Sequence, residues 1–140
     1  MGLGWVRVSL RGYGSREPTG TAFFDLIGIR PGDGFPISAS DSAWKAARVE
    51  FVTVTMDECR DTSEPREEFV ARLDAGLCRA AEWLLARPPE VFERWRSSGR
   101  KADVFVGGWL EGEQLDLAFP AVFLLACGQA GLPIEICIND

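Results

Sequence analysis

Histidine is absent from the 140 residues of this chain, and its absence excludes several kinds of active site. A Ser-His-Asp triad and a Cys-His pair both use an imidazole as the general base, so this chain can build neither. Metal sites that depend on imidazole ligands are excluded for the same reason. Any chemistry carried by this protein would have to use carboxylates or other side chains.

Cysteine is scarce and widely spaced, and the four residues are Cys59, Cys78, Cys127 and Cys137. No two of them form a C-x-x-C pair, so a zinc site would need all four to converge from distant segments. We expect reduced thiols that pack as small apolar groups. The sequence therefore predicts no metal ion and no cofactor.

Long apolar runs and an excess of basic charge are also missing. No segment approaches the roughly 20 apolar residues that span a bilayer, and Arg7 interrupts the apolar N-terminal stretch, so no signal peptide is predicted. The formal net charge of −6 opposes binding to phosphate backbones and anionic lipids. We expect a cytosolic protein without nucleic-acid or membrane partners. The acidic balance fits ordinary solubility or a basic protein partner.

What the chain does have is the composition of a globular domain. Hydrophobic residues make up 46% of it and charged residues 26%, which is typical of a folded protein rather than a disordered one. The length suits one domain with its own core. We predict a single domain over residues 1–140.

Hydrophobic periodicity divides the chain into predicted strands and helices. Alternation with a period of two predicts strands at residues 5–10, 47–55, 103–110, 114–117 and 134–138. Apolar spacings of three and four predict helices at 19–28, 65–87, 88–95 and 120–131, and the glycine-rich segment 30–42 predicts a loop. A hairpin turn at 111–113 and the mixed connections favour an α+β fold. We predict two layers, with helices on one face of a mostly antiparallel sheet of about five strands.

Two acidic clusters could serve a carboxylate site. The first is Asp57, Glu58 and Asp61, and the second is Glu111, Glu113 and Asp116. Either could hold a divalent cation or perform acid–base catalysis if it folded around a cleft. Neither has the spacing of a calcium loop, and solvated turns explain both. Gly107 and Gly108 match no phosphate loop and predict instead a bulge or a close approach of backbone.

The alternation of the strands places a distinctive set of side chains on the sheet face opposite the helices. Val6, Val8 and Leu10 alternate toward the covered side, which leaves the other side to a set that combines aromatic and charged residues. That set is Trp5, Arg7, Phe105, Trp109 and Glu135. Tryptophan and arginine anchors amid charge are typical of partner-binding surfaces. A loop such as 30–42 folded over these side chains is the alternative interpretation, and self-association is another.

Short segments of the chain resemble a known family. They are Val6-Arg7-Val8-Ser9-Leu10, Leu26-Ile27-Gly28-Ile29-Arg30-Pro31-Gly32, Trp44, and the run from Leu115 through Leu124-Leu125 and Gly131-Leu132-Pro133-Ile134 to Asn139-Asp140. With these features the chain resembles the uncharacterised bacterial family called domain of unknown function 4279. That family supplies no catalytic residues. The resemblance implies binding rather than catalysis, because some small bacterial proteins of this kind serve as immunity proteins against toxins.

These observations support three functional hypotheses. The first is a non-enzymatic bacterial protein-binding domain, in an immunity or accessory role, with its partner on the Trp/Arg sheet face. The second is an enzyme or small-molecule binder with a carboxylate site, in which Asp57, Asp61 or Glu113 meets Arg7 or Arg48 in a pocket. The third is a structural homodimer whose sheet faces pack together.

Overall fold

The computed structural model describes residues 3–13, 22–29, 51–59, 66–110 and 117–139, which form four strands and four helices. In chain order these are β1 (Leu3–Tyr13), α1 (Ala22–Ile27), β2 (Phe51–Cys59), α3 (Arg66–Leu85), α4 (Glu90–Ser97), β3 (Lys101–Leu110), α5 (Ala121–Gln129) and β4 (Ile134–Asn139). The predicted α+β class is therefore confirmed, and each described helix falls within or beside a predicted one.

The described strands form one mixed sheet in the order β2-β1-β3-β4. β1 is antiparallel to both β2 and β3, whereas β3 and β4 are parallel. The prediction of about five mostly antiparallel strands is not confirmed. β4 follows β3 through the helix α5, and a crossover of this kind returns the chain in the same direction. Of the fourth strand predicted at 114–117, residues 114–116 lie outside the described residues, and Leu117 is not in a strand.

Two strands differ in extent from their predictions. β1 continues to Tyr13, beyond the predicted end at Leu10, and pairs along this whole length with β3. β2 continues to Cys59, beyond the predicted end at Thr55, while positions 47–50 of its predicted start fall in a part of the chain that is not described. Both extensions consist largely of polar residues, which are held in the sheet by backbone hydrogen bonds to a neighbouring strand. The alternation of apolar residues in the sequence does not predict such extensions.

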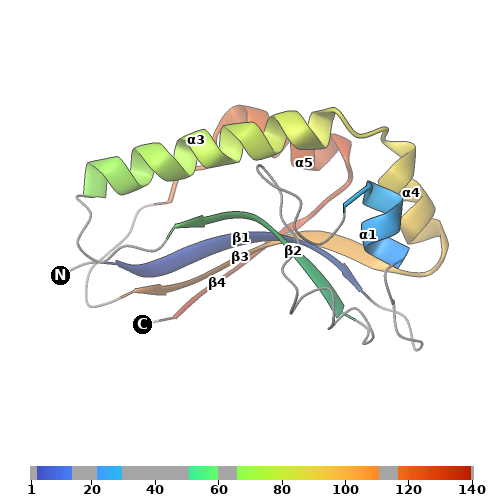
Figure 1. Cartoon of the computed structure of the whole chain (residues 1–140), viewed down its shortest axis with the longest axis horizontal. Helices are drawn as coiled ribbons and strands as arrows, with labels where there is room; N and C mark the ends of the chain where they lie inside the picture. Colours follow the sequence, from blue (N-terminus) through green and yellow to red (C-terminus); the bar gives the residue numbers. More distant parts are fainter. Residues whose placement is uncertain (1–2, 14–21, 30–50, 60–65, 111–116, 140) are drawn as a thin grey trace.

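The helices lie together on one side of the sheet (Figure 1). α3 and α5 pack side by side over the sheet, and α1 and α4 pack near the end where β1 stops and β3 begins. α3 begins with Glu67 and Glu68, whose charges favour a helix N-terminus. It buries Phe69, Leu73 and Leu77 at the predicted spacing.

The core lies between this helical layer and the inner face of the sheet. Val6, Val8 and Leu10 of β1 are at most 1% exposed, as are Val104 and Val106 of β3. The prediction that one alternating set of β1 faces the helices is therefore confirmed. In β4 the outcome is mixed. Ile134 and Ile138 pack against the core, but Ile136 between them is 53% exposed.

Gly12 shows how closely α1 approaches the sheet. Gly12 follows Leu10 on the inner face, and a Cβ at this position would collide with the ring of Phe23 from α1. The Phe23 ring in turn lies 4.9 Å from the ring of Trp95 in α4, centroid to centroid. Glycine is required at position 12 because an aromatic ring occupies the space of its side chain.

The end of α5 is held by a glycine and an arginine. Gly131 has a positive φ of 68°, and the N–H of Leu132 donates to the carbonyl of Cys127 at 2.8 Å, which closes the helix. Nη1 of Arg96 donates to the carbonyl of Ala130 at 2.9 Å. A cation at a helix C-terminus also interacts favourably with the helix dipole.

None of the helices in the described part of the chain is both long and apolar enough to cross a membrane.

Candidate functional site: the outer face of the sheet

The residues predicted for a binding surface lie on neighbouring positions of β1, β3 and β4. Trp5 is the backbone partner of Trp109 across β1 and β3, and Arg7 is the partner of Gly107. Phe105 is the partner of Glu135 across β3 and β4. Arg7 and Phe105 are half-buried and Glu135 is exposed. The side chains of Trp5 and Trp109 are not among those described, so their part of the prediction stays a prediction.

Arg11 is the centre of this outer face. Its Nε donates to Oδ1 of Asp103 at 2.7 Å, and its Nη2 donates to Oδ2 of the same carboxylate at 2.6 Å. Nη2 also donates to Oε2 of Glu135 at 2.8 Å. The bidentate pairing matches the planar guanidinium to the planar carboxylate and fixes the orientation of Arg11. These bonds link β1, β3 and β4 through one side chain of each strand, namely Arg11, Asp103 and Glu135.

Two aromatic rings complete this cluster. The guanidinium carbon of Arg11 lies 4.2 Å from the ring centroid of Phe105 and 5.4 Å from that of Tyr13, both within the range of cation–π attraction. The hydroxyl of Tyr13 donates to Oδ2 of Asp103 at 3.0 Å. We call Arg11, Tyr13, Asp103, Phe105 and Glu135 the Arg11 cluster.

Hydrogen bonds and burial move two pKa values in the Arg11 cluster away from neutrality. The hydrogen bond from Arg11 to Asp103 raises the pKa of Arg11, although burial opposes this effect. Burial raises the pKa of Tyr13, and its hydrogen bond to Asp103 raises it further. A general acid or base works best with a pKa near the operating pH. Both groups stay protonated at neutral pH, so their role is to hold a fixed arrangement rather than to exchange protons.

Exposure rises across this face toward β4. Ser9 and Asp103 are buried, and the side chain of Arg11 is only 13% exposed, whereas that of Glu135 is 62% exposed. The centre of the outer face, at Arg11 and Asp103, is therefore its least exposed described part. The β4 side of this face is accessible, since Glu135 and Cys137 are both exposed there.

Gly107 makes room for Phe105. A Cβ at Gly107 would lie 2.8 Å from the ring of Phe105, so the ring occupies the space that a side chain would take. The pairing of β3 with β1 and β4 runs through Gly107 and Gly108 without a shift in register. The predicted bulge is not present at these glycines, and the group that approaches Gly107 closely is the side chain of Phe105 rather than a neighbouring backbone.

Sequence reasoning missed Arg11, Tyr13 and Asp103. The signal was available, because the alternation that places Arg7 on the outer face also places Arg11 and Tyr13 there once β1 continues past Leu10. Asp103 is two residues before Phe105 in β3, so the two side chains lie on the same face of the sheet. What the sequence did not show was where β1 ends.

The acidic clusters receive little support as a catalytic or metal site. The register aligns Glu58 with Arg7 and Asp57 with Val8. Asp61, Glu111, Glu113, Asp116 and Arg48 belong to segments that the structure does not describe. Within the described residues no group of three or more Cys, Asp and Glu residues could hold a metal ion.

The described cysteines differ in environment. Cys127 is buried and burial raises its pKa to about 12, so its thiol is unreactive at neutral pH. Cys137 is exposed on β4 and Cys78 is half-buried on α3; all three are free thiols. The prediction of packed apolar thiols is therefore confirmed for Cys127 and wrong for Cys137. The side chain of Cys59 is not described.

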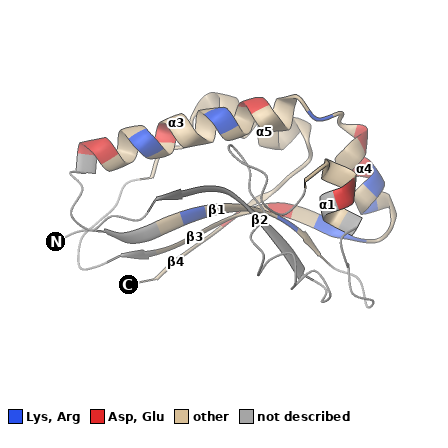
Figure 2. Ribbon diagram, in the orientation of Figure 1, with Lys and Arg blue, Asp and Glu red and all other residues tan. Residues whose placement is uncertain are grey.

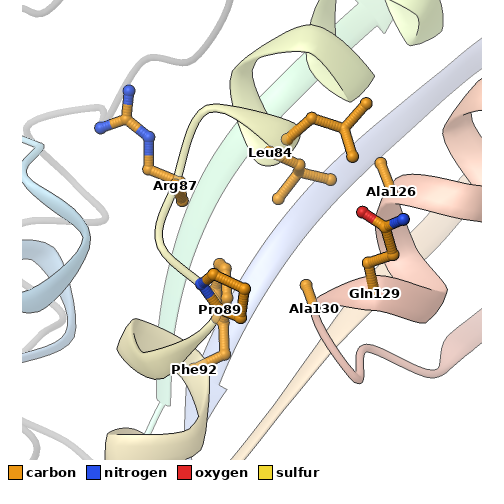
Figure 3. Close-up of a pocket in the computed structure, with 8 residues that line it drawn as sticks. Leu84, Arg87, Pro89, Phe92, Ala126, Gln129 and Ala130 are labelled. Atoms are coloured by element: carbon orange, nitrogen blue, oxygen red, sulfur yellow. The ribbon is translucent and has the colours of Figure 1, made fainter.

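One small cavity lies where α3 ends, α4 begins and α5 ends (Figure 3). It has a volume of about 60 Å³, and Leu84, Phe92 and Ala126 are among its lining residues. The guanidinium of Arg87 points away from it in Figure 3 and stacks on Trp83 at 4.4 Å. Ligand pockets for small molecules usually measure about 300–1,000 Å³, so this cavity holds a few water molecules at most.

A wider depression of about 490 Å³ lies along α3, between Glu67, Val70, Ala71 and Asp74. All four residues belong to one helix, and none of them is basic. Among its described lining residues the depression has no convergent set of polar groups of the kind that orients a substrate.

Comparisons with protein-family models, with curated proteins and with solved structures found no match for this chain. The resemblance to domain of unknown function 4279 therefore stays a prediction.

Proposed function

We propose that this chain is a non-enzymatic protein-binding domain whose partner contacts the outer face of the sheet along β3 and β4. The observation that carries the proposal is the Arg11 cluster, in which a guanidinium is fixed by Asp103 and Glu135 against the ring of Phe105. Arginine and aromatic residues dominate the energetics of many interfaces. Side chains that are already ordered lose little entropy on binding, so a partner gains affinity from them.

Glu135 is the group through which this surface selects its partner. Its carboxylate is 62% exposed although it binds Arg11, and it lies beside the half-buried ring of Phe105. The whole chain carries a net charge of −6. A partner with a lysine or arginine at the contact would be attracted over distance and could share the carboxylate at close range. Nucleic acid is a poor partner because the same net charge repels its phosphates.

The immunity or accessory role implied by the family resemblance is one form that this binding would take, since an immunity protein acts by occupying a surface of its toxin. We place that activity in the cytosol. The carboxylate enzyme remains the alternative function, and no observation on the described residues favours it.

The proposal is tested with a charge reversal at the exposed end of the cluster. The tagged wild-type chain, Glu135→Arg and the control Glu82→Arg would each be used to capture partners from the native host. Glu82 is also exposed but lies on α3, in the helical layer on the other side of the sheet. Both variants change the net charge equally, so only the site differs.

We expect the wild type and Glu82→Arg to recover the same protein and Glu135→Arg to lose it, with affinity at least about tenfold weaker. Glu135→Gln removes the charge with little change of shape and should weaken binding less. Recovery of no reproducible partner by the wild type would refute the proposal. So would a partner retained equally by all variants.

A further inference from the structure

α5 presents an apolar surface to solvent although it belongs to the helical layer. Six large hydrophobic side chains are exposed in the described part of the chain, and three of them lie on α5. They are Val122, Leu124 and Leu125, exposed by 37%, 49% and 54%. The buried side of the same helix carries Phe123, Ala126 and Cys127. A helix that is apolar on all sides is typical of one that is covered on all sides.

Charge distinguishes α5 from the other described helices. α1, α3 and α4 each contain charged residues, whereas the nine residues of α5 contain none (Figure 2). Two copies of a chain with a net charge of −6 repel each other over most of their surface. A surface without charge is where two such copies meet with the least repulsion.

Gly128 is a second, independent feature of this surface. It is exposed within α5, its φ is not positive, and a Cβ built there meets no atom within 4 Å. Neither backbone conformation nor packing against the described residues requires glycine at this position. Glycine weakens a helix relative to alanine. Its effect on shape is to leave a gap on the surface, and this gap lies one turn after Leu124, on the same side of the helix.

Leu124 and Gly128 are spaced so that this surface of α5 can fit the same surface of a second copy. In a pair of antiparallel α5 helices related by a two-fold axis at the level of Ala126, Leu124 of each copy faces Gly128 of the other. Because a two-fold axis repeats every contact, the leucine of each copy packs against the glycine of the other. The gap at Gly128 also allows the two helix axes to approach closely.

We propose that the chain forms a homodimer in which α5 packs antiparallel against α5 of a second copy, with Leu124 of each copy seated at Gly128 of the other. This contact lies in the helical layer, on the opposite side of the sheet from the Arg11 cluster. The homodimer through sheet faces, which was the third hypothesis from the sequence, would instead cover that cluster. The α5 contact leaves the outer face available, so the two proposals stand or fall separately.

The test measures the molar mass of the full chain by sedimentation equilibrium over a wide range of protein concentration and at two salt concentrations. We expect a reversible monomer–dimer equilibrium for the wild type. Added salt should strengthen the dimer because it screens repulsion between the acidic copies while the apolar contact persists. A mass equal to the monomer at all concentrations would overturn the proposal.

Gly128→Leu separates the dimer contact from the fold. The surrounding space is open and leucine favours a helix over glycine, so the monomer should keep or raise its melting temperature. The added side chain occupies the place of the incoming Leu124, so the dimer dissociation constant should rise at least about tenfold. Leu124→Glu should have the same effect on the dimer by placing like charges at the contact.

Val70→Glu is the matched control, since Val70 is similarly exposed but lies on α3. It adds the same charge as Leu124→Glu and should leave the dimer in place apart from a small general weakening. A dimer that survives both Gly128→Leu and Leu124→Glu would overturn the proposal. A chain that stays monomeric and instead loses a different bound protein on Leu124→Glu would also overturn it, because the occupant of α5 would then be another protein.

Discussion

The two faces of the sheet are held together by different chemistry, although the same strands supply both. The inner face consists of apolar side chains such as Val8 and Val104 that are excluded from water. The outer face is joined by the Arg11 cluster, in which charge, hydrogen bonds and ring contacts act together. Apolar burial tolerates many arrangements of similar volume, whereas a bidentate ion pair requires one geometry. The inner face therefore contributes most of the stability, and the outer face contributes a specific arrangement.

The largest effect is expected from the inner face, at the contact between Phe23 and Gly12. Phe23→Ala should lower the free energy of unfolding by about 3–5 kcal/mol, because it leaves a cavity beneath α1. Urea denaturation of the purified chain measures this loss. Gly12→Ala should also destabilise the wild type, since its Cβ collides with the ring.

The double variant sharpens this prediction. In the Phe23→Ala background the new methyl group at position 12 enters the cavity instead of a ring, so Gly12→Ala should cost less there than in the wild type. Equal costs in both backgrounds would show that the ring does not determine the need for glycine.

A smaller effect is expected from the centre of the outer face. Asp103→Ala removes the acceptor for both Arg11 and Tyr13 and leaves a guanidinium that is only 13% exposed without its main partner. The expected loss in the free energy of unfolding is about 2–3 kcal/mol, because a largely buried guanidinium then keeps only weaker partners such as the exposed carboxylate of Glu135. Glu135→Ala is the control within the same cluster. Its carboxylate is mostly exposed, so the loss should stay below about 1 kcal/mol.

Similar losses for the two substitutions would contradict the gradient of exposure from β3 to β4. Both are measured by urea denaturation at low and high salt. The loss from Glu135→Ala should shrink further at high salt, because ions screen exposed pairs more than buried ones.

An effect smaller than that of Asp103→Ala is expected from Cys127, which the helical layer keeps neutral by burial. The pKa of this thiol is 9.0 in its ordinary state and about 12 in the fold. Because the folded pKa is the higher one, the contribution of Cys127 is fully present below pH 9 and is lost as pH rises toward 12. At pH 10 the thiol is ionised in the unfolded chain but not in the fold, and this ionisation lowers the free energy of unfolding by at most about 1.4 kcal/mol.

The check compares the wild type with Cys127→Ala at pH 7 and pH 10. Both lose stability from other titrating groups, but the difference in unfolding free energy between them should shrink at the higher pH. A difference that is the same at both pH values would show that the thiol is not held neutral by the fold.

Much of the secondary structure followed from periodicity. The spacing of Phe69, Leu73 and Leu77 predicted α3, and the alternation of Val6, Val8 and Leu10 predicted the inner face of β1. The direction of β4 did not follow in this way. An alternating strand reads the same whether its neighbour runs parallel or antiparallel, because both orientations present one face to the core.

The candidate site was predictable only in part. The alternation of side chains along each strand predicted that Arg7, Phe105 and Glu135 lie on one face, and in the structure Phe105 and Glu135 are side by side. The burial of Asp103 was not predictable, because a carboxylate is expected at the surface unless a partner is known. That partner, Arg11, is 92 residues distant in sequence.

By itself the sequence determined which side chains of each strand lie on the same face, since alternation is a property of the extended chain and needs no neighbour. The tertiary structure decided which residues of different strands meet. The parallel pairing of β3 with β4 places Glu135 beside Phe105, and the antiparallel pairing of β1 with β3 places Arg11 beside Asp103. Such pairings depend on strand order and register. Register is specified by the burial of one alternating apolar set on the inner face rather than by the polar residues that it brings together.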